Sequence, residues 1–127
     1  MPYRMQSRWI SYENTPLFGI NLDGFGADRQ RLQAEIEAVE TILRQKERNT
    51  VLAVVDLALT DIGPEVIAFL HAHSGQESDP IRKMAIIGIS PVRQTWYRLV
   101  RKISWPKHAH FFDEHEKAKP WLVSETR

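Results

Sequence analysis

Two continuous apolar runs constrain the fold of this chain more than any other feature. Val51–Leu57 and Lys83–Ile89 are rich in β-branched residues and contain almost no polar interruption. Strands of this kind are covered on both faces, as at the centre of a parallel sheet. A helical pattern follows each run, as the crossover between parallel strands requires. The chain is therefore predicted to be an α/β protein.

The remaining segments complete a regular order of strands and helices. An antiparallel hairpin is predicted from strands over residues 8–13 and 17–22, joined by a turn at Asn14-Thr15-Pro16. Helices are predicted over residues 27–48, from Pro64 onward and from Pro91 to about 103, with Ser90 as the N-cap of the third. A strand over 108–112 and a last helix follow. This order predicts a mixed four- or five-stranded sheet with an N-terminal antiparallel hairpin and about four helices packed on it.

Helical spacing indicates which side of each helix faces the sheet. In the first helix, Glu35 is assigned to the solvated face, and the buried stripe is predicted to be Leu32, Ile36, Val39 and Leu43. In the third helix, an apolar arc about 100° wide is expected to dock on the sheet and comprises Val92, Trp96, Leu99, Val100 and Ile103. In the last helix, Asp113 and Glu116 form a capping pattern, and Pro120 is expected to bend or end the helix.

Composition narrows the class of protein. The 127 residues fit one domain, 1–127, and the absence of cysteine excludes disulfides and thiolate chemistry. A formal net charge of +1 argues against nucleic acid as a partner. No apolar run is long enough to span a bilayer, and no signal-peptide pattern opens the chain. We therefore expect a soluble protein of the bacterial or a similar cytoplasm.

Three segments resemble the STAS-like family, in particular small stand-alone bacterial proteins similar to the sporulation anti-anti-sigma factor and to SEC14-type lipid carriers. They are the strand Val51–Leu57, the segment Arg82–Gly88 and the tail Phe112–Leu122. The resemblance covers nearly the whole chain and implies a mixed sheet with helices on one side. It also implies regulatory or binding work rather than catalysis.

The chain departs from the family at the switch position. Anti-anti-sigma proteins of this group carry a phosphorylatable serine at the start of the helix after the Asp-Leu strand. Here residues 56–64 contain no serine, and Thr60 is the nearest hydroxyl. A kinase-controlled switch is therefore not expected.

Polar residues at the carboxyl ends of the two central strands form the first candidate site. The ligand or switch candidates there are Asp56, Thr60, Asp61 and Ser90. Ligands of open α/β sheets bind at strand ends, and a helix N-terminus attracts anions. The alternative interpretation is that Ser90 and Asp61 only cap their helices.

A basic, aromatic segment forms the second candidate. Every charged residue from Arg82 to Lys107 is basic. The predicted partner surface consists of Arg93, Trp96, Tyr97, Arg98 and Arg101, with Arg93, Tyr97, Arg98 and Arg101 pointing away from the apolar arc. An acidic protein, a phosphate-bearing ligand or an anionic membrane would fit it. The alternative is an ordinary solvated helix face.

The histidines and the search for catalytic motifs give weaker evidence for a functional site. His108 and His110 would share one face of a strand, but a third ligand is missing, and His73 is expected to be a hydrogen-bonded core residue. No metal, no cofactor and no catalytic residue is predicted, because no phosphate loop, nucleophile elbow or metal-binding helix is present.

The sequence therefore predicts a non-catalytic regulatory or protein-interaction module whose partner is another protein. The alternative is a carrier or sensor of a small apolar or amphipathic ligand, held in a pocket lined by Phe18, Phe25, Phe69 and Trp96. The exposed edge of the N-terminal hairpin would also allow two copies of the chain to pair as a homodimer.

Overall fold

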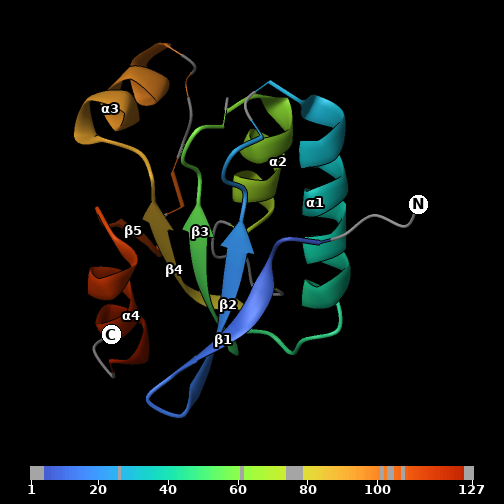
Figure 1. Cartoon of the computed structure of the whole chain (residues 1–127), viewed down its shortest axis with the longest axis vertical. Coiled ribbons are helices and arrows are strands. Elements are labelled where there is room, and N and C mark those ends of the chain that lie inside the picture. Colours follow the sequence, from blue (N-terminus) through green and yellow to red (C-terminus); the bar gives the residue numbers. More distant parts are fainter. Residues whose placement is uncertain are drawn as a thin grey trace.

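A computed structural model describes residues 5–25, 27–60, 62–73, 79–100, 102, 105–106 and 108–124. Within them lies one mixed sheet whose strand order is the order of the sequence, β1-β2-β3-β4-β5 (Figure 1). The first two strands form an antiparallel hairpin, and every later neighbour is parallel. This confirms the predicted mixed sheet. The strands are β1 (Arg8–Tyr12), β2 (Thr15–Asn21), β3 (Val51–Asp56), β4 (Ile81–Ile87) and β5 (Ala109–Phe111).

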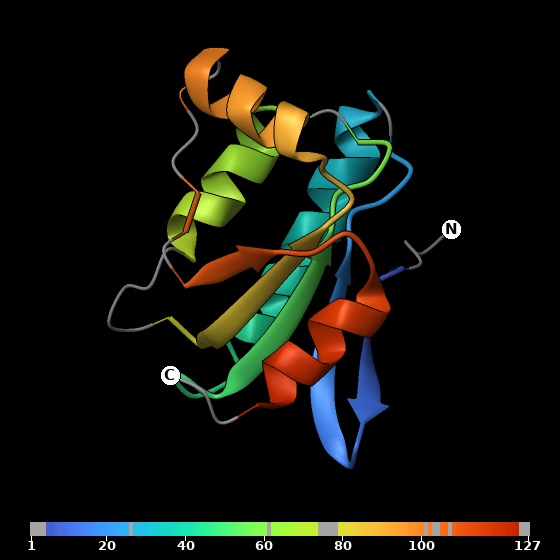
Figure 2. The same cartoon turned by 90° about the vertical axis from the view of Figure 1, so that its left-hand side faces the viewer.

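The described residues form four helices, which lie on both sides of the sheet (Figure 2). Because the strand order never reverses, right-handed crossovers place the three connecting helices on one side. These helices are α1 (Arg29–Leu43), α2 (Pro64–Ala72) and α3 (Pro91–Val100). The last helix, α4 (His115–Val123), follows the final strand and packs on the opposite face against β3 and β4. The one-sided cover implied by the family resemblance is therefore incorrect.

The core is divided by the sheet into a large and a small cluster. Ala53 and Val55 of β3 belong to the large cluster with the buried stripes of α1 and α2. Val54, between them in sequence, belongs to the small cluster with Ala118 and Leu122 of α4. Successive strand residues point to opposite faces, so a strand covered on both sides has no polar alternation. This is the reason for the continuous apolar run in the sequence.

The hairpin turn lies one residue earlier than predicted. Glu13 and Asn14 have positive φ values of 51° and 62°, and β2 begins directly afterwards at Thr15. A two-residue hairpin loop with this backbone matches the right-handed twist of its strands, and asparagine adopts it readily. The predicted proline position therefore falls inside β2, where Pro16 pairs with Ser11.

The first helix is shorter than predicted, and one of its residues was misassigned. It begins after Asp28, whose side chain accepts a hydrogen bond from the Arg31 N–H, and ends at Leu43. The predicted stripe is buried: Leu32, Ile36, Val39 and Leu43. Glu35 is also fully buried, because its carboxylate accepts hydrogen bonds from the backbone N–H groups of Gln6 and Ser7. The prediction of a solvated Glu35 was wrong.

Pro64 and Pro91 begin α2 and α3, as the sequence predicted. In the last helix, the predicted cap was wrong, and the helix does not end at Pro120. α4 continues through Pro120 to Val123, and neither Asp113 nor Glu116 forms the predicted cap. Asp113 forms an i,i+4 ion pair with Lys117 at 3.1 Å, which holds its carboxylate outside the helix start.

Among the described residues, no helix is both long and apolar enough to cross a membrane.

Candidate functional site

The candidates at the carboxyl ends of the central strands do not form one site. Thr60 is buried, with 2% of its surface exposed, and its hydroxyl bonds the Leu22 carbonyl and accepts the Phe25 N–H at 3.2 Å. Thr60 therefore fastens the loop after β2 to the loop after β3. A hydroxyl engaged in this way is inaccessible to a kinase. Asp61 lies outside the described residues.

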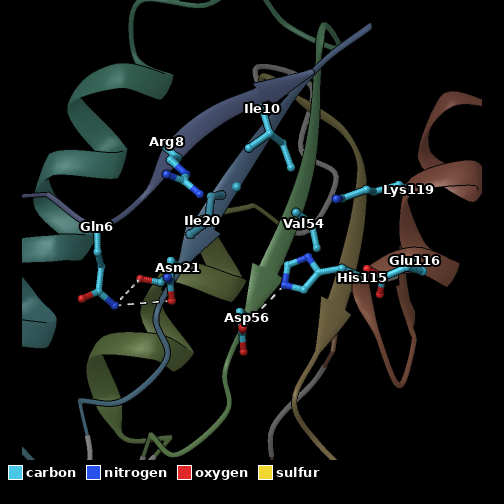
Figure 3. Close-up of a pocket in the computed structure, with 11 residues that line it drawn as sticks. Gln6, Arg8, Ile10, Ile20, Asn21, Val54, Asp56, His115, Glu116 and Lys119 are labelled. Atoms are coloured by element: carbon cyan, nitrogen blue, oxygen red, sulfur yellow. Dashed lines mark hydrogen bonds and ion pairs between the residues drawn. The ribbon is translucent and has the colours of Figure 1, made fainter. Parts of the chain in front are cut away.

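Asp56 and Ser90 line two different hollows. Asp56 contributes to a hollow of about 330 Å³ between the hairpin and α4, where its Oδ2 lies 3.7 Å from His115 Nε2 (Figure 3). Its Oδ1 accepts the Ala58 N–H at 3.0 Å. Ser90 lies at a hollow of about 480 Å³ with Phe111 and Phe112, and its Oγ accepts the Arg93 N–H at 3.3 Å. Ser90 therefore caps α3, as predicted.

The strand order explains this separation. Ligand crevices in open α/β sheets form where the strand order reverses, and here it never does. The loops at this edge are also in close backbone contact. Gly88 has a φ of 90°, and a Cβ at this position would lie 2.5 Å from the Ala58 nitrogen. The loops after β3 and β4 therefore touch each other at this edge.

The third helix is turned over relative to its predicted orientation. Tyr97, expected at the surface, is buried in the core with 4% exposure. The apolar arc expected to dock on the sheet faces solvent instead: Val92 is 79% exposed, Trp96 45%, Leu99 63% and Val100 56%. Ile103 lies outside the described residues. Helical periodicity identified the arc correctly but could not show what covers it.

The basic residues of α3 divide between two roles. Arg93 is half-buried, donates to the Tyr97 hydroxyl at 3.1 Å and lies over its ring. Arg98 is exposed, and Arg101 lies outside the described residues. The α3 surface is therefore formed by the four exposed apolar side chains and one adjoining cation: Val92, Trp96, Leu99, Val100 and Arg98.

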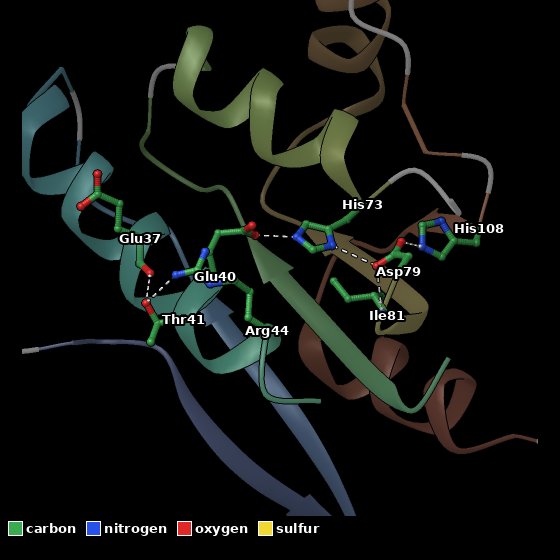
Figure 4. Close-up of polar contacts among 8 residues, drawn as sticks. All are labelled: Glu37, Glu40, Thr41, Arg44, His73, Asp79, Ile81 and His108. Atoms are coloured by element: carbon green, nitrogen blue, oxygen red, sulfur yellow. Dashed lines mark hydrogen bonds and ion pairs between the residues drawn. The ribbon is translucent and has the colours of Figure 1, made fainter. Parts of the chain in front are cut away.

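A histidine–carboxylate network lies at the opposite end of the parallel strands (Figure 4). His73, predicted to be a core histidine, is buried and bonds Asp79 through Nδ1 at 2.9 Å and Glu40 through Nε2 at 2.5 Å. His108 Nε2 lies 3.5 Å from the other oxygen of Asp79. His110 instead lies against Trp121, with ring centroids 4.5 Å apart, so the two histidines of the predicted pair have separate partners. No cluster able to hold a metal occurs in the part of the chain that the structure describes.

The network determines the charge of His73. Burial disfavours the imidazolium, but hydrogen bonds with Asp79 and Glu40 outweigh burial and raise the pKa of His73 to about 9. Burial likewise opposes ionisation of Asp79, yet hydrogen bonds with His108 and His73 hold the pKa of Asp79 below its usual value. At neutral pH a buried cation is thus bracketed by two carboxylates.

The four aromatic residues predicted to line a ligand pocket are not gathered around one. Phe18, Phe25 and Phe69 are buried in the large core cluster, whereas Trp96 is on the α3 surface. None of the four lines the hollows described here beside Asp56 and Ser90.

Comparison with solved structures identifies the fold. The chain matches an uncharacterized protein of the DUF3478 family with a SpoIIAA-like fold from Shewanella loihica PV-4, with a TM-score of 0.61. The match covers 92% of each chain. This chain has a SpoIIAA-like, that is STAS-like, fold. The identity is 16%, so the likeness establishes the fold alone. No family model and no curated protein matches the sequence.

Proposed function

We propose that this STAS-like protein is a non-catalytic interaction module that docks an acidic partner protein through the α3 surface. The observation that carries the proposal is the orientation of α3. The helix is anchored by Tyr97 and presents its apolar arc to solvent. Exposed apolar patches on soluble proteins mark interaction sites.

The chemistry of the α3 surface favours a protein partner. Tryptophan and arginine dominate the energetic centres of protein interfaces, and Trp96 and Arg98 both belong to this surface. No acidic residue occurs on α3, so the surface complements a negatively charged partner. The net charge of +1 gives little general attraction to an anionic membrane, which we treat as the competing outcome.

The absence of catalysis is part of the proposal. The hydroxyls and carboxylate predicted at the strand ends are engaged in structural contacts. Thr60 fastens two loops, Ser90 caps α3, and Asp56 accepts the Ala58 N–H. The interaction surface needs none of these groups.

The first test is photo-crosslinking in cells of the source organism. A photoreactive phenylalanine replaces Trp96 in one variant and Trp9 in another. Trp9 is a matched control because it is 39% exposed and lies on β1, away from α3. We expect one identified protein with an acidic surface to crosslink at position 96 and not at position 9. Equal adducts at both positions would contradict the proposal.

The second test uses the crosslinked partner after purification. Trp96→Ala should weaken binding by about 2 kcal/mol, roughly thirtyfold, because a tryptophan at an interface centre contributes energy of this size. Arg98→Glu should weaken it further at low salt. If the wild type instead binds phosphatidylserine vesicles in a Trp96-dependent way and no purified protein, the protein-partner proposal is wrong.

A further inference from the structure

The hollow between the hairpin and α4 has the features of a binding site on the face of the sheet opposite α3. We propose that this hollow binds a small organic anion, a carboxylate with a short apolar body, between Arg8 and Lys119. No residue that lines it belongs to α3, so the inference is independent of the docking surface. The residues that carry the argument are Arg8, Ile10, Gly19, Val54, Asp56 and Lys119 (Figure 3).

The hollow exists because α4 covers only part of the sheet. This helix packs on β3 and β4, so the hairpin strands extend beyond it. Gly19 lies in the uncovered part, directly between Arg8 and Val54 in the strand register. Because Gly19 has no side chain, the floor of the sheet is lowered at this point. A Cβ here would lie 3.2 Å from the Arg8 carbonyl oxygen, so β1 would have to shift slightly to accept one.

Two cations reach into the hollow from opposite sides. Arg8 extends from β1 and Lys119 from α4 (Figure 3). Among the residues that the structure describes, neither side chain forms an ion pair or a side-chain hydrogen bond. An arginine fork matches the two oxygens of a carboxylate, and a lysine adds a point charge. An anion between them would neutralise both charges.

The acidic residues that line the hollow do not form ion pairs with Arg8 or Lys119. Asp56 lies at the end of β3, where one oxygen accepts the Ala58 N–H and the other lies 3.7 Å from His115 Nε2. Glu116 is exposed on α4. The amide of Gln6 is also engaged, because it donates to Asn21 and to the Asp23 carbonyl. Arg8 and Lys119 therefore remain the cations available to an anion.

The apolar floor of the hollow favours a ligand that carries an apolar body beside its anionic group. Ile10 and Val54 belong to the α4 side of the sheet and give an apolar surface beside the two cations, whereas the Ile20 side chain is buried in the large core cluster on the other face. Its volume of about 330 Å³ is at the small end of the range for ligand sites. A small molecule with one anionic group and a short hydrocarbon or aromatic body fits both features. Inorganic phosphate satisfies the cations but leaves the apolar floor uncovered.

The inference is tested by titrating isotope-labelled full-length protein with benzoate and following backbone amide signals by NMR. Benzyl alcohol is the matched neutral probe, and inorganic phosphate is the anion without an apolar body. Benzoate should shift the signals of Gly19, Val54 and Lys119 saturably. It should bind about tenfold more tightly than either comparison probe, because the charge and the apolar body each contribute.

Variants locate the binding within the hollow. Arg8→Gln and Lys119→Gln should each weaken benzoate binding about five- to tenfold, since each removes a charge-assisted contact. Gly19→Val should abolish it by raising the floor. Lys117→Gln is the control, because Lys117 pairs with Asp113 outside the hollow. The spectrum of each variant reports whether it is folded.

Three outcomes would overturn the inference. The first is equal binding of benzoate and benzyl alcohol. The second is benzoate binding that survives the combined Arg8→Gln and Lys119→Gln changes. The third is phosphate binding as tightly as benzoate, which would remove the requirement for an apolar body. The wild-type comparison of the three probes decides the first and third outcomes without any variant.

Discussion

Single buried polar residues connect parts of this protein that are distant in sequence. Glu35 joins α1 to the segment before β1 through the backbone N–H groups of Gln6 and Ser7, at 3.0 and 2.7 Å. Thr60 joins two loops in a similar way. Glu35 was assigned to solvent and Thr60 to a ligand or switch site, because a glutamate on a helix and a threonine in a loop are usually solvated. Their partners lie 28 and 35 residues away, and no local pattern reveals them.

Replacing Glu35 should show how much this connection contributes. Glu35→Ala leaves two N–H donors without their acceptor in a buried place, so we expect a loss of about 2 to 4 kcal/mol in the free energy of unfolding. Glu37→Ala, on the exposed face of the same helix, should change it by about 0.5 kcal/mol or less. Urea denaturation measures both. Similar losses for the two variants would show that the buried contact contributes little.

At the scale of elements, the sequence predicted the presence and order of strands and helices well. The buried runs, the hairpin and the prolines that begin α2 and α3 are local signals, and they lie where expected. Orientation was predicted less well. The apolar arc of α3 was read from Val92, Trp96 and Leu99, but a periodic pattern does not specify whether the sheet or another molecule covers it. The site prediction failed at Tyr97 for this reason.

The orientation of α3 predicts that Tyr97, outside the apolar arc, contributes more to stability than Trp96, which lies on the arc. Tyr97→Ala should lower the free energy of unfolding by about 3 kcal/mol, because it empties a buried position in the large core cluster. Trp96→Ala should lower it by about 1 kcal/mol or less, although tryptophan is the larger residue. Thermal or urea unfolding of the isolated protein checks the contrast. The reverse ranking would mean that the arc faces the sheet.

At the scale of the whole molecule, the network around His73 connects four segments. Glu40 belongs to α1, His73 follows α2, Asp79 precedes β4, and His108 precedes β5. The core position of His73 was predictable from its place on an apolar stripe. Its carboxylate partners were not, because they come together only when the sheet and both helices are assembled.

Stability should therefore depend on pH. The folded pKa of His73, about 9, exceeds the ordinary 6.5. Its contribution is then complete below pH 6.5 and is lost as the pH rises through about 9, by on the order of 3 kcal/mol. Asp79 has a lowered pKa, so its contribution is present above its ordinary 3.8 and is lost in acid.

Urea denaturation across the pH range checks this dependence. His73→Gln should flatten the alkaline limb, whereas His71→Gln, which replaces an exposed residue of α2, should retain it. An unchanged alkaline limb in His73→Gln would show that the network does not hold a proton above neutrality.

The strand order has a consequence for how the protein is made. Each strand pairs with the strand that precedes it in the chain, so the sheet can grow in one direction as the polypeptide leaves the ribosome. Helix α4 can cover the second face only after residue 123 has been synthesised. Until then Val54, Ala85 and Ile87 have no helix above them. A nascent chain stalled before residue 115 would therefore be a substrate for chaperones that bind apolar surfaces.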